Sequence, residues 1–205
     1  MASGASIGMI SFATSICCSK VHAYTIKKIS EIMSSRIIIR PETPSDHAAI
    51  SSITESAFRT LEISSNTEHF IVDALRAAGA LTSSLVTEQE GRVVGHIAFS
   101  PITVSDDTTD WYGLGPVSVV PELQRQGIGK ALIREGLAQL RTLGAKGCCL
   151  VGHPEYYRQF GFTNTPDLSH EGVPPEVFFA LAFEGPVPKG TVKFHDAFAV
   201  TGPQS

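Results

Sequence analysis

The amino-acid sequence predicts an α/β domain built on a mixed β-sheet of about seven strands flanked by helices. Short apolar runs alternate with segments of helical periodicity in the order β-α-α-β-β-β-α-β-α-β-β. Two β-rich runs flank the turn dipeptide Glu90-Gly91, which predicts an antiparallel hairpin. Residues 111–152 run from strand to helix to strand, which is typical of a parallel crossover. Hairpins and crossovers in one chain together predict a mixed sheet.

The N-terminal half of this domain is predicted to contain a strand at residues 36–42 and then two helices. Thr43 is expected to cap the first helix, because Pro44 suits the first helical position and Asp46 follows the cap by three residues. Asn66 is expected to cap the second helix and Gly79 to end it. The apolar faces of the two helices are Ile50, Ile53, Ala57 and Leu61, and Phe70, Ile71, Ala74 and Leu75.

The C-terminal half contains the longest predicted helix, residues 128–143, in which Ile133, Leu137 and Leu140 share one face. Strands are predicted on either side of it, at residues 111–120 and 147–152. A short helix is expected at residues 154–160, with a proline at its first position. Two further segments are predicted as closing strands: residues 176–183 and 191–200.

Length and composition allow one globular domain with an N-terminal extension. The chain has 205 residues, of which 42% are hydrophobic and 18% are charged. Residues 1–33 are rich in Ser, Ala and Ile without clear periodicity, and we expect them to be a disordered extension, with a mitochondrial targeting segment as the alternative. The folded domain is expected to span residues 34–205.

Charge and cysteine patterns exclude several classes of function. The net charge of the chain is −4, although residues 1–40 contain five Lys or Arg and only one Glu. The rest of the chain is therefore acidic. An acidic domain argues against a nucleic-acid partner, because binding phosphates needs positive charge. No apolar run approaches the roughly 18 residues of a membrane-spanning helix. The four cysteines stand in two adjacent pairs without CxxC spacing, which predicts no metal site and a reducing, cytoplasmic setting: Cys17, Cys18, Cys148 and Cys149.

The stretch "QRQGIGKA", residues 124–131, lies between a predicted strand and the longest helix. It is not a Walker loop, because Ala131 follows Gly129-Lys130 and Gln124 stands where the first glycine belongs. It is not a dinucleotide fingerprint, because Leu132 stands where the third glycine belongs. A [Q/R]-x-x-G-x-[G/A] pattern remains. At a helix N-terminus it would offer free N–H groups to an anion, with glycines that let the anion approach.

The segments "LGPVSVVPELQRQGIGKALI" and "GHPEYYRQFGF" together resemble the GNAT superfamily of acetyl-CoA-dependent acyltransferases, and in particular its YhbS-like group. The segments "EHFIVDALR", "SLVTEQEGRVVGHIAFSP" and "GTVKFHDAF" are similar to that group as well. The resemblance covers about residues 36–200. It implies the GNAT fold, a splayed mixed sheet in which acetyl-CoA, as cosubstrate, lies between the strands at 113–120 and 148–152.

The resemblance also implies which residues hold acetyl-CoA. Backbone groups of three residues on one strand would pair with the pantetheine arm: Val117, Ser118 and Val119. Residues of the motif would surround the pyrophosphate: Gln124, Arg125, Gln126, Gly127, Ile128, Gly129 and Lys130. His153 and Pro154 replace an asparagine-containing stretch that is more usual in the family, so we make no assignment there.

By resemblance, Tyr157 is the catalytic acid that protonates the CoA thiolate, because it precedes Gly161 by the four residues typical of the family. A phenol is a plausible proton donor for a leaving thiolate. From the residues alone, Tyr156 is equally eligible. The position of the general base seen in some members falls on Gly113, so no base can be assigned. The remaining candidates are Glu68, His96 and Glu122.

The expected function is direct acetyl transfer from acetyl-CoA to a primary amine in a ternary complex, without a metal. The acceptor is expected to be a small-molecule amine or a protein amine. Two alternatives stay open: a CoA-binding module or sensor that has lost acetyl transfer, and an interaction domain that does not bind CoA. A homodimer through the closing strands is expected from the resemblance.

Overall fold

The computed structural model describes residues 37–59 and 66–202. Its helices are α2 (His47–Phe58), α3 (Glu68–Ala77), α4 (Ile128–Thr142) and α5 (Pro154–Tyr157), with the 3-10 turns η1 (Pro44–Asp46), η2 (Pro121–Leu123), η3 (Arg158–Phe160), η4 (Pro175–Val177) and η5 (Asp196–Ala199). Its strands are β1 (Ile38–Pro41), β2 (Ser83–Gln89), β3 (Arg92–Pro101), β4 (Thr103–Val104), β5 (Trp111–Val119), β6 (Gly147–Val151), β7 (Leu168–His170), β8 (Phe178–Ala182) and β9 (Gly190–Lys193). The predicted extension 1–33 and Leu61 lie outside the described residues.

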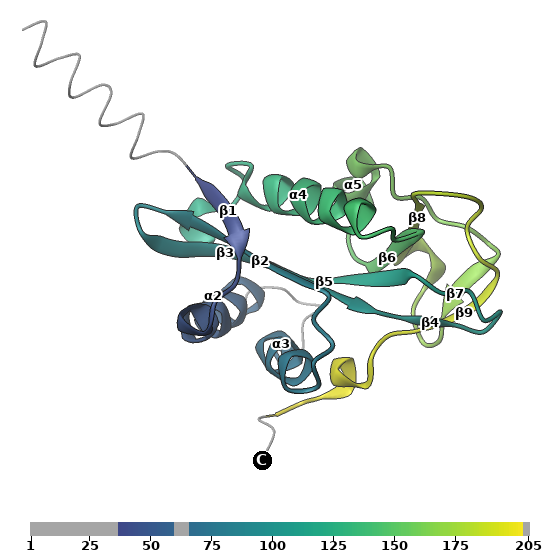
Figure 1. Ribbon diagram of the computed structural model, residues 1–205, viewed down its shortest axis with the longest axis horizontal. Helices are drawn as coiled ribbons and strands as arrows, with labels where there is room; N and C mark the ends of the chain where they lie inside the picture. Colours follow the sequence, from purple (N-terminus) through teal and green to yellow (C-terminus); the bar gives the residue numbers. More distant parts are fainter. Residues whose placement is uncertain (1–36, 60–65, 203–205) are drawn as a thin grey trace, which may run out of the picture. The chain divides into compact units, whose positions relative to one another are not determined.

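The predicted mixed sheet is confirmed, and its strands divide into two sheets (Figure 1). Six strands run in the order β1-β2-β3-β5-β6-β8, and neighbours are antiparallel except for the parallel pair β5 and β6. A second sheet has the order β4-β9-β7. The described residues therefore contain nine strands instead of the predicted number of about seven. The sequence did not reveal β7, because three residues are too few to show an alternating pattern.

Two sequence predictions about the ends of elements are wrong. The strand predicted at 191–200 ends at Lys193, and the chain then turns into η5. The ring of His195 stabilises this turn, because its Nδ1 accepts a hydrogen bond from the N–H of Ala197 at 3.1 Å. The second helix has Thr67 at its N-cap instead of Asn66, which has a positive φ of 58°.

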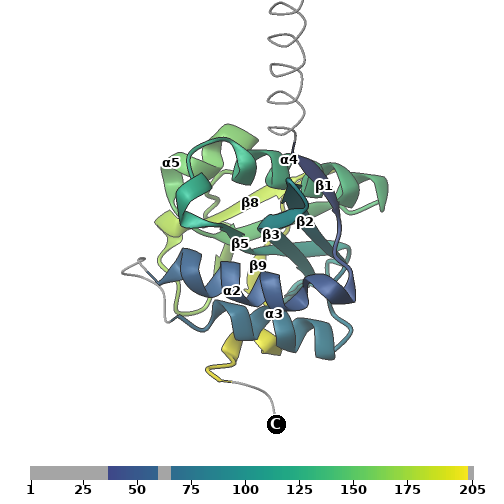
Figure 2. The same ribbon diagram turned by 90° about the vertical axis from the view of Figure 1, so that its left-hand side faces the viewer.

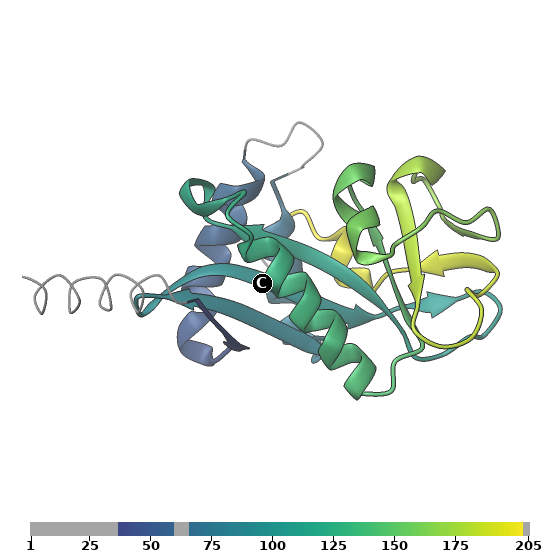
Figure 3. The ribbon, with the colours of Figure 1, turned by 90° about the horizontal axis from the view of Figure 1, so that it is seen from above.

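Helices cover both faces of the six-stranded sheet. α4 and α5 lie on one face, and α2, α3 and η5 lie on the other (Figure 1). α2 and α3 pack against each other beneath β3 and β5 (Figure 2), and seen from above α4 crosses β2, β3 and β5 (Figure 3). The main core lies between α4 and the sheet, where Leu132, Ile133 and Leu140 are fully buried.

A glycine of α4 lets the helix pack closely on the sheet. Gly136 faces the ring of Phe99 on β3, and a Cβ at Gly136 would lie only 2.5 Å from Cζ of that ring. The aromatic ring therefore occupies the space that a side chain would take, which brings the helix close to the strand.

A partly buried polar network connects Glu42, which directly follows β1, with α3 and the sheet. Arg76 on α3 donates two hydrogen bonds to the Glu42 carboxylate, at 2.8 and 3.0 Å. Ser84 donates to the same carboxylate at 2.5 Å, and its oxygen lies 2.8 Å from Nε2 of His96. Because the Ser84 proton goes to Glu42, the serine oxygen accepts from His96, and Nε2 carries the imidazole proton.

Within the described residues, no helix combines the length and apolarity needed to span a membrane. The proposed homodimer through the closing strands stays a prediction.

Candidate active site

The six-stranded sheet opens between its two parallel strands. β5 and β6 pair from Trp111↔Gly147 to Gly113↔Cys149 and no further. Beyond this point β5 stays paired with β3 up to Val119, while β6 follows β8 up to Val151. The two strands diverge because each keeps its other partner, and the predicted splay of the sheet lies at the predicted place.

A cavity of about 450 Å³ lies at this opening, within the size range of small-molecule sites. Its walls are largely apolar and come from β5, the end of β6, α5, α3 and the C-terminal segment. The lining residues are Phe58, Glu68, Ile71, Leu114, Gly115, Pro116, Val117, Val151, Gly152, His153, Tyr156, Tyr157, His170, Phe194 and Phe198.

The motif at residues 124–130 forms the turn into α4, as predicted. Gly127 is the N-cap of α4 with a φ of +94°, a left-handed conformation that favours glycine. The first hydrogen bond of the helix runs from the Ala131 N–H to the Gly127 carbonyl at 3.0 Å. The amides that precede it at a helix N-terminus have no acceptor within the helix and suit an anion. Arg125 and Lys130 are exposed beside this turn.

The side chains of two glutamines in the motif brace the turn. Nε2 of Gln124 donates to the Val119 carbonyl at 3.1 Å, and Nε2 of Gln126 donates to the Glu122 carbonyl at 3.1 Å. These bonds hold the turn against the end of β5 and against η2. The two glutamines therefore shape the backbone cradle, and a role as direct ligands of an anion stays a prediction.

Gly129 has a structural role that the sequence did not reveal. A Cβ at Gly129 would lie 2.9 Å from the hydroxyl oxygen of Tyr156. The missing side chain thus lets the tyrosine hydroxyl reach the first turn of α4. Because Tyr156 also lines the cavity, this contact connects the turn at residues 124–130 to the cavity.

The predicted acid, Tyr157, lies deeper than its neighbour. Tyr157 is 8% exposed and lines the cavity, whereas Tyr156 is half-buried. The two rings meet edge to face with centroids 5.1 Å apart. Burial raises the pKa of the Tyr157 phenol, and Tyr156 and Cys148 raise it further. Gly152 makes room for the Tyr157 ring, since a Cβ there would lie 2.9 Å from Cδ2 of the ring.

The place of the family's strand glutamate is filled by an aromatic ring. A Cβ at Gly113 would lie 2.5 Å from Cε1 of Phe194 and 3.2 Å from Cγ2 of Ile102. No acidic side chain fits there while Phe194 keeps its position. Phe194, which is far along the chain, therefore occupies the space that a glutamate side chain at position 113 would need.

The three candidate bases lie in different environments. His96 is fully buried in the Glu42 network and is not part of the cavity wall. Glu122 is exposed in η2. Glu68, in the first turn of α3, lines the cavity. The structure thus brings Glu68 together with Tyr157 and separates both from His96.

Sequence reasoning missed His170, which also lines the cavity. Its Nδ1 lies 2.9 Å from the Val192 carbonyl oxygen, which can only accept, so Nδ1 carries the proton and Nε2 of the neutral ring is an acceptor. No sequence signal pointed to this residue, because β7 was not predicted. The described part of the chain contains no group of three or more His, Cys, Asp or Glu that could hold a metal ion.

Of the three strand residues predicted to hold pantetheine, Val117 lines the cavity. The Ser118 hydroxyl is buried and lies 3.1 Å from the Thr54 hydroxyl on α2. The Val119 carbonyl already accepts from Gln124.

Comparisons with known proteins agree with this architecture. A model of the acetyltransferase (GNAT) family matches residues 48–162. The uncharacterized N-acetyltransferase YhbS of Escherichia coli K12 is 35% identical over 127 residues, which cover 62% of this chain and 73% of the relative.

Two crystal structures are similar over most of the chain. One is a GNAT family acetyltransferase from Brucella melitensis in complex with acetyl-CoA, with 52% identity and a TM-score of 0.72 over 80% of this chain and 98% of that one. The other is YhbS from Escherichia coli in complex with CoA, with 30% identity and a TM-score of 0.73 over 82% and 95% of the two chains.

Proposed function

Because this chain belongs to the acetyltransferase (GNAT) family, we propose that it transfers an acetyl group from acetyl-CoA to a primary amine inside the cavity between β5 and β6. The observation that carries the proposal is the cavity itself, which opens where the β5–β6 pairing ends and is connected through Tyr156 to the N-terminus of α4. Similar structures that contain acetyl-CoA or CoA support the choice of cosubstrate.

In this proposal the pantetheine arm lies along the free edge of β5 beyond Gly113, where backbone groups of Val117, Ser118 and Val119 are its partners. The pyrophosphate lies at the first turn of α4. Free amide groups, the helix dipole and the exposed cations Arg125 and Lys130 favour an anion there.

The reaction needs no covalent enzyme intermediate. The neutral amine nitrogen attacks the thioester carbonyl, the new C–N bond forms, and the C–S bond breaks to release the CoA thiolate. Tyr157 is the donor to the sulfur as negative charge develops. Its raised pKa keeps the phenol protonated through the neutral range, so the proton is present when the thiolate leaves. The proton lost by the amine passes to water or to an acceptor in the cavity such as Nε2 of His170.

The test is thiol release from acetyl-CoA with a panel of primary amines, comparing Tyr157→Phe with Tyr156→Phe. We expect Tyr157→Phe to lower kcat by about 100-fold, the order of a lost general acid, while CoA affinity stays unchanged. Tyr156→Phe is the matched control, because it removes a hydroxyl from the adjacent ring. An equal loss in both variants would assign the hydroxyls a shared structural role instead.

A CoA-binding module without transfer is the second candidate, and the Phe194 ring in the place of the strand glutamate favours it. It predicts tight CoA binding, no thiol release with any amine, and no effect of Tyr157→Phe on any measured property. Turnover that depends on Tyr157 excludes this candidate.

A further inference from the structure

The cavity has a second end on the face of the sheet opposite α4 and α5. Phe58 at the end of α2 and Phe198 in η5 contribute to it from that face (Figure 1). We call this the acceptor end and define it as Phe58, Glu68, Ile71, His170, Phe194 and Phe198. Phe58, Glu68, Ile71 and Phe198 come from α2, α3 and η5, on the face opposite α4 and α5, whereas the proposed function places the CoA pyrophosphate at the first turn of α4.

Among the described residues, the acceptor end contains the carboxylate of Glu68 and no Lys or Arg. Glu68 contributes a carboxylate whose Oε2 is buried, and no Lys or Arg is among the described residues that line the cavity. A ligand carboxylate or phosphate would be buried here without a cation, which is strongly unfavourable, whereas an ammonium group gains a partner.

The second polar group at this end is also a hydrogen-bond acceptor. His170 donates from Nδ1 to Val192, so Nε2 of the neutral ring accepts. Its ring packs beside Phe194, with centroids 5.0 Å apart, and beside Phe178, with centroids 6.2 Å apart. The Glu68 carboxylate and this nitrogen are both groups that accept hydrogen bonds, which suits a ligand that donates them, as an amine does.

The remaining walls of the acceptor end are apolar and mostly aromatic. Phe58, Ile71 and Phe198 offer no hydrogen bonds, so polar groups on the ligand would be buried without partners. The whole cavity has a volume of about 450 Å³ and must also hold the thioester, which leaves room for a small body only.

We propose that the acceptor is a primary amine on a small aryl or alkyl body without carboxylate or phosphate, and that Glu68 binds its ammonium group. This inference rests on the proposed function and names its substrate class.

The first test compares 2-phenylethylamine with phenylalanine, which has the same skeleton plus one carboxylate. With the full chain and saturating acetyl-CoA, we expect kcat/KM to be about 100-fold higher or more for 2-phenylethylamine. Ethanolamine, which lacks the apolar body, is expected to react poorly as well. Equal kcat/KM for 2-phenylethylamine and phenylalanine would overturn the inference.

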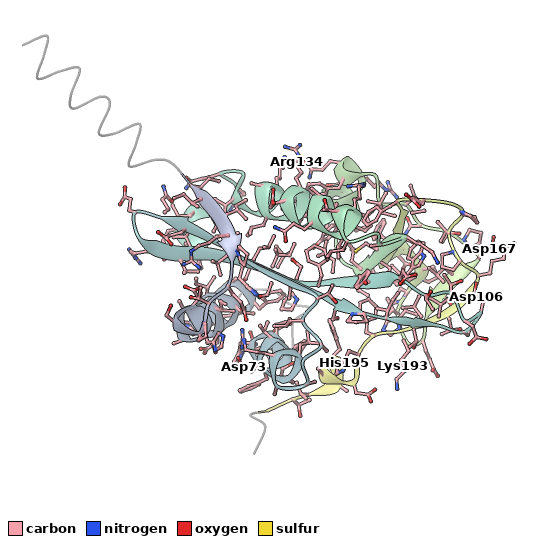
Figure 4. The ribbon with its side chains drawn as sticks, viewed as in Figure 1. Asp73, Asp106, Arg134, Asp167, Lys193 and His195 are labelled. Carbon is pink, nitrogen blue, oxygen red and sulfur yellow. The ribbon has the colours of Figure 1, made fainter. Side chains whose placement is uncertain are left out.

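The second test replaces Glu68 by Gln, which keeps the shape and removes the charge. We expect KM for 2-phenylethylamine to rise about 10-fold or more, the usual loss for a charged hydrogen-bond partner, with the CoA dissociation constant unchanged. Asp73→Asn is the matched control. Asp73 is an exposed carboxylate on the same helix, paired with Arg76 at 2.6 Å (Figure 4), and is not part of the cavity wall. An unchanged KM in a folded Glu68→Gln variant would contradict the role of Glu68.

The outcomes separate the two proposals. Efficient acetylation of amino acids or polyamines, with poor use of 2-phenylethylamine, would overturn the acceptor class and leave the acetyltransferase intact. CoA binding without acetylation of any amine would overturn both. If Glu68→Gln does not fold, the comparison of 2-phenylethylamine with phenylalanine still tests the acceptor class, because it uses the unaltered protein.

Discussion

The buried imidazole of His96 predicts a pH dependence of stability that can be worked out from the structure. Burial lowers its pKa from the ordinary value of 6.5 to about 4; the carboxylate of Glu42 opposes this shift, and the guanidinium of Arg76 adds to it. Between these two values the unfolded chain holds a proton that the folded protein does not. The stability is therefore present above about pH 6.5 and is lost as the pH falls towards about 4.

The size of the effect follows from the gap between the two pKa values. Each unit corresponds to about 1.4 kcal/mol, so the free energy of unfolding should fall by about 2 kcal/mol between about pH 7.5 and about pH 5. At about pH 4 the loss should approach about 3 kcal/mol. Asp46, whose pKa the Arg40 guanidinium holds far below its usual range, adds a further loss only at lower pH.

The assay is urea unfolding at several pH values for the unaltered protein, His96→Gln and His47→Gln. Glutamine at position 96 does not titrate, so we expect that variant to lose less than about 0.5 kcal/mol over the same range. His47 is the control, because its ring is 38% exposed and lies 3.6 Å from the same Glu42 carboxylate. Equal pH slopes for the unaltered protein and His96→Gln would refute the reasoning.

Three further predictions concern close contacts. Gly113→Ala should lower the free energy of unfolding by about 1–3 kcal/mol, because its Cβ would meet the ring of Phe194. Adding Phe194→Leu to that variant should recover part of the loss in urea unfolding. If the effects of the two substitutions simply add, the contact is not the cause. Gly136→Ala should lower the melting temperature, because the ring of Phe99 fills the space of the new methyl group. Alanine by itself favours a helix over glycine by about 1 kcal/mol. A higher melting temperature would therefore show that the contact with Phe99 relaxes. Ser118→Ala should lower the free energy of unfolding by about 1 kcal/mol, because the Thr54 hydroxyl loses its hydrogen-bond partner. The CoA affinity measured by calorimetry should stay unchanged, because the backbone of the strand is unaltered. A large loss of affinity would contradict binding through the backbone alone.

The regular elements could be predicted because they depend on local patterns, whereas the location of the opening followed from the family resemblance. The helix over Ile128–Thr142, the hairpin at Glu90-Gly91 and the turn at Gly127 all follow from periodicity or backbone preference within a few residues. The presence of Tyr157 in the cavity wall followed from resemblance, and its role stays a prediction.

What could not be predicted depends on contacts between distant parts of the chain. Periodicity does not reveal that Phe194 replaces a side chain at Gly113, or that Gly129 makes room for Tyr156. The same holds for His170, whose short strand pairs with the distant β9. His170 and Phe194 of the acceptor end are such residues, which is why the sequence left the second substrate open.

The pairing of Trp111 with Gly147 gives the protein a built-in optical probe. Trp111 is the single tryptophan of the chain, 2% exposed, and its ring covers Gly147 below the point where β5 and β6 separate. Its fluorescence therefore reports whether the closed part of the strand pair is intact. A spectral shift on unfolding, with little change when CoA enters the open part, would let one signal separate loss of structure from occupancy of the site.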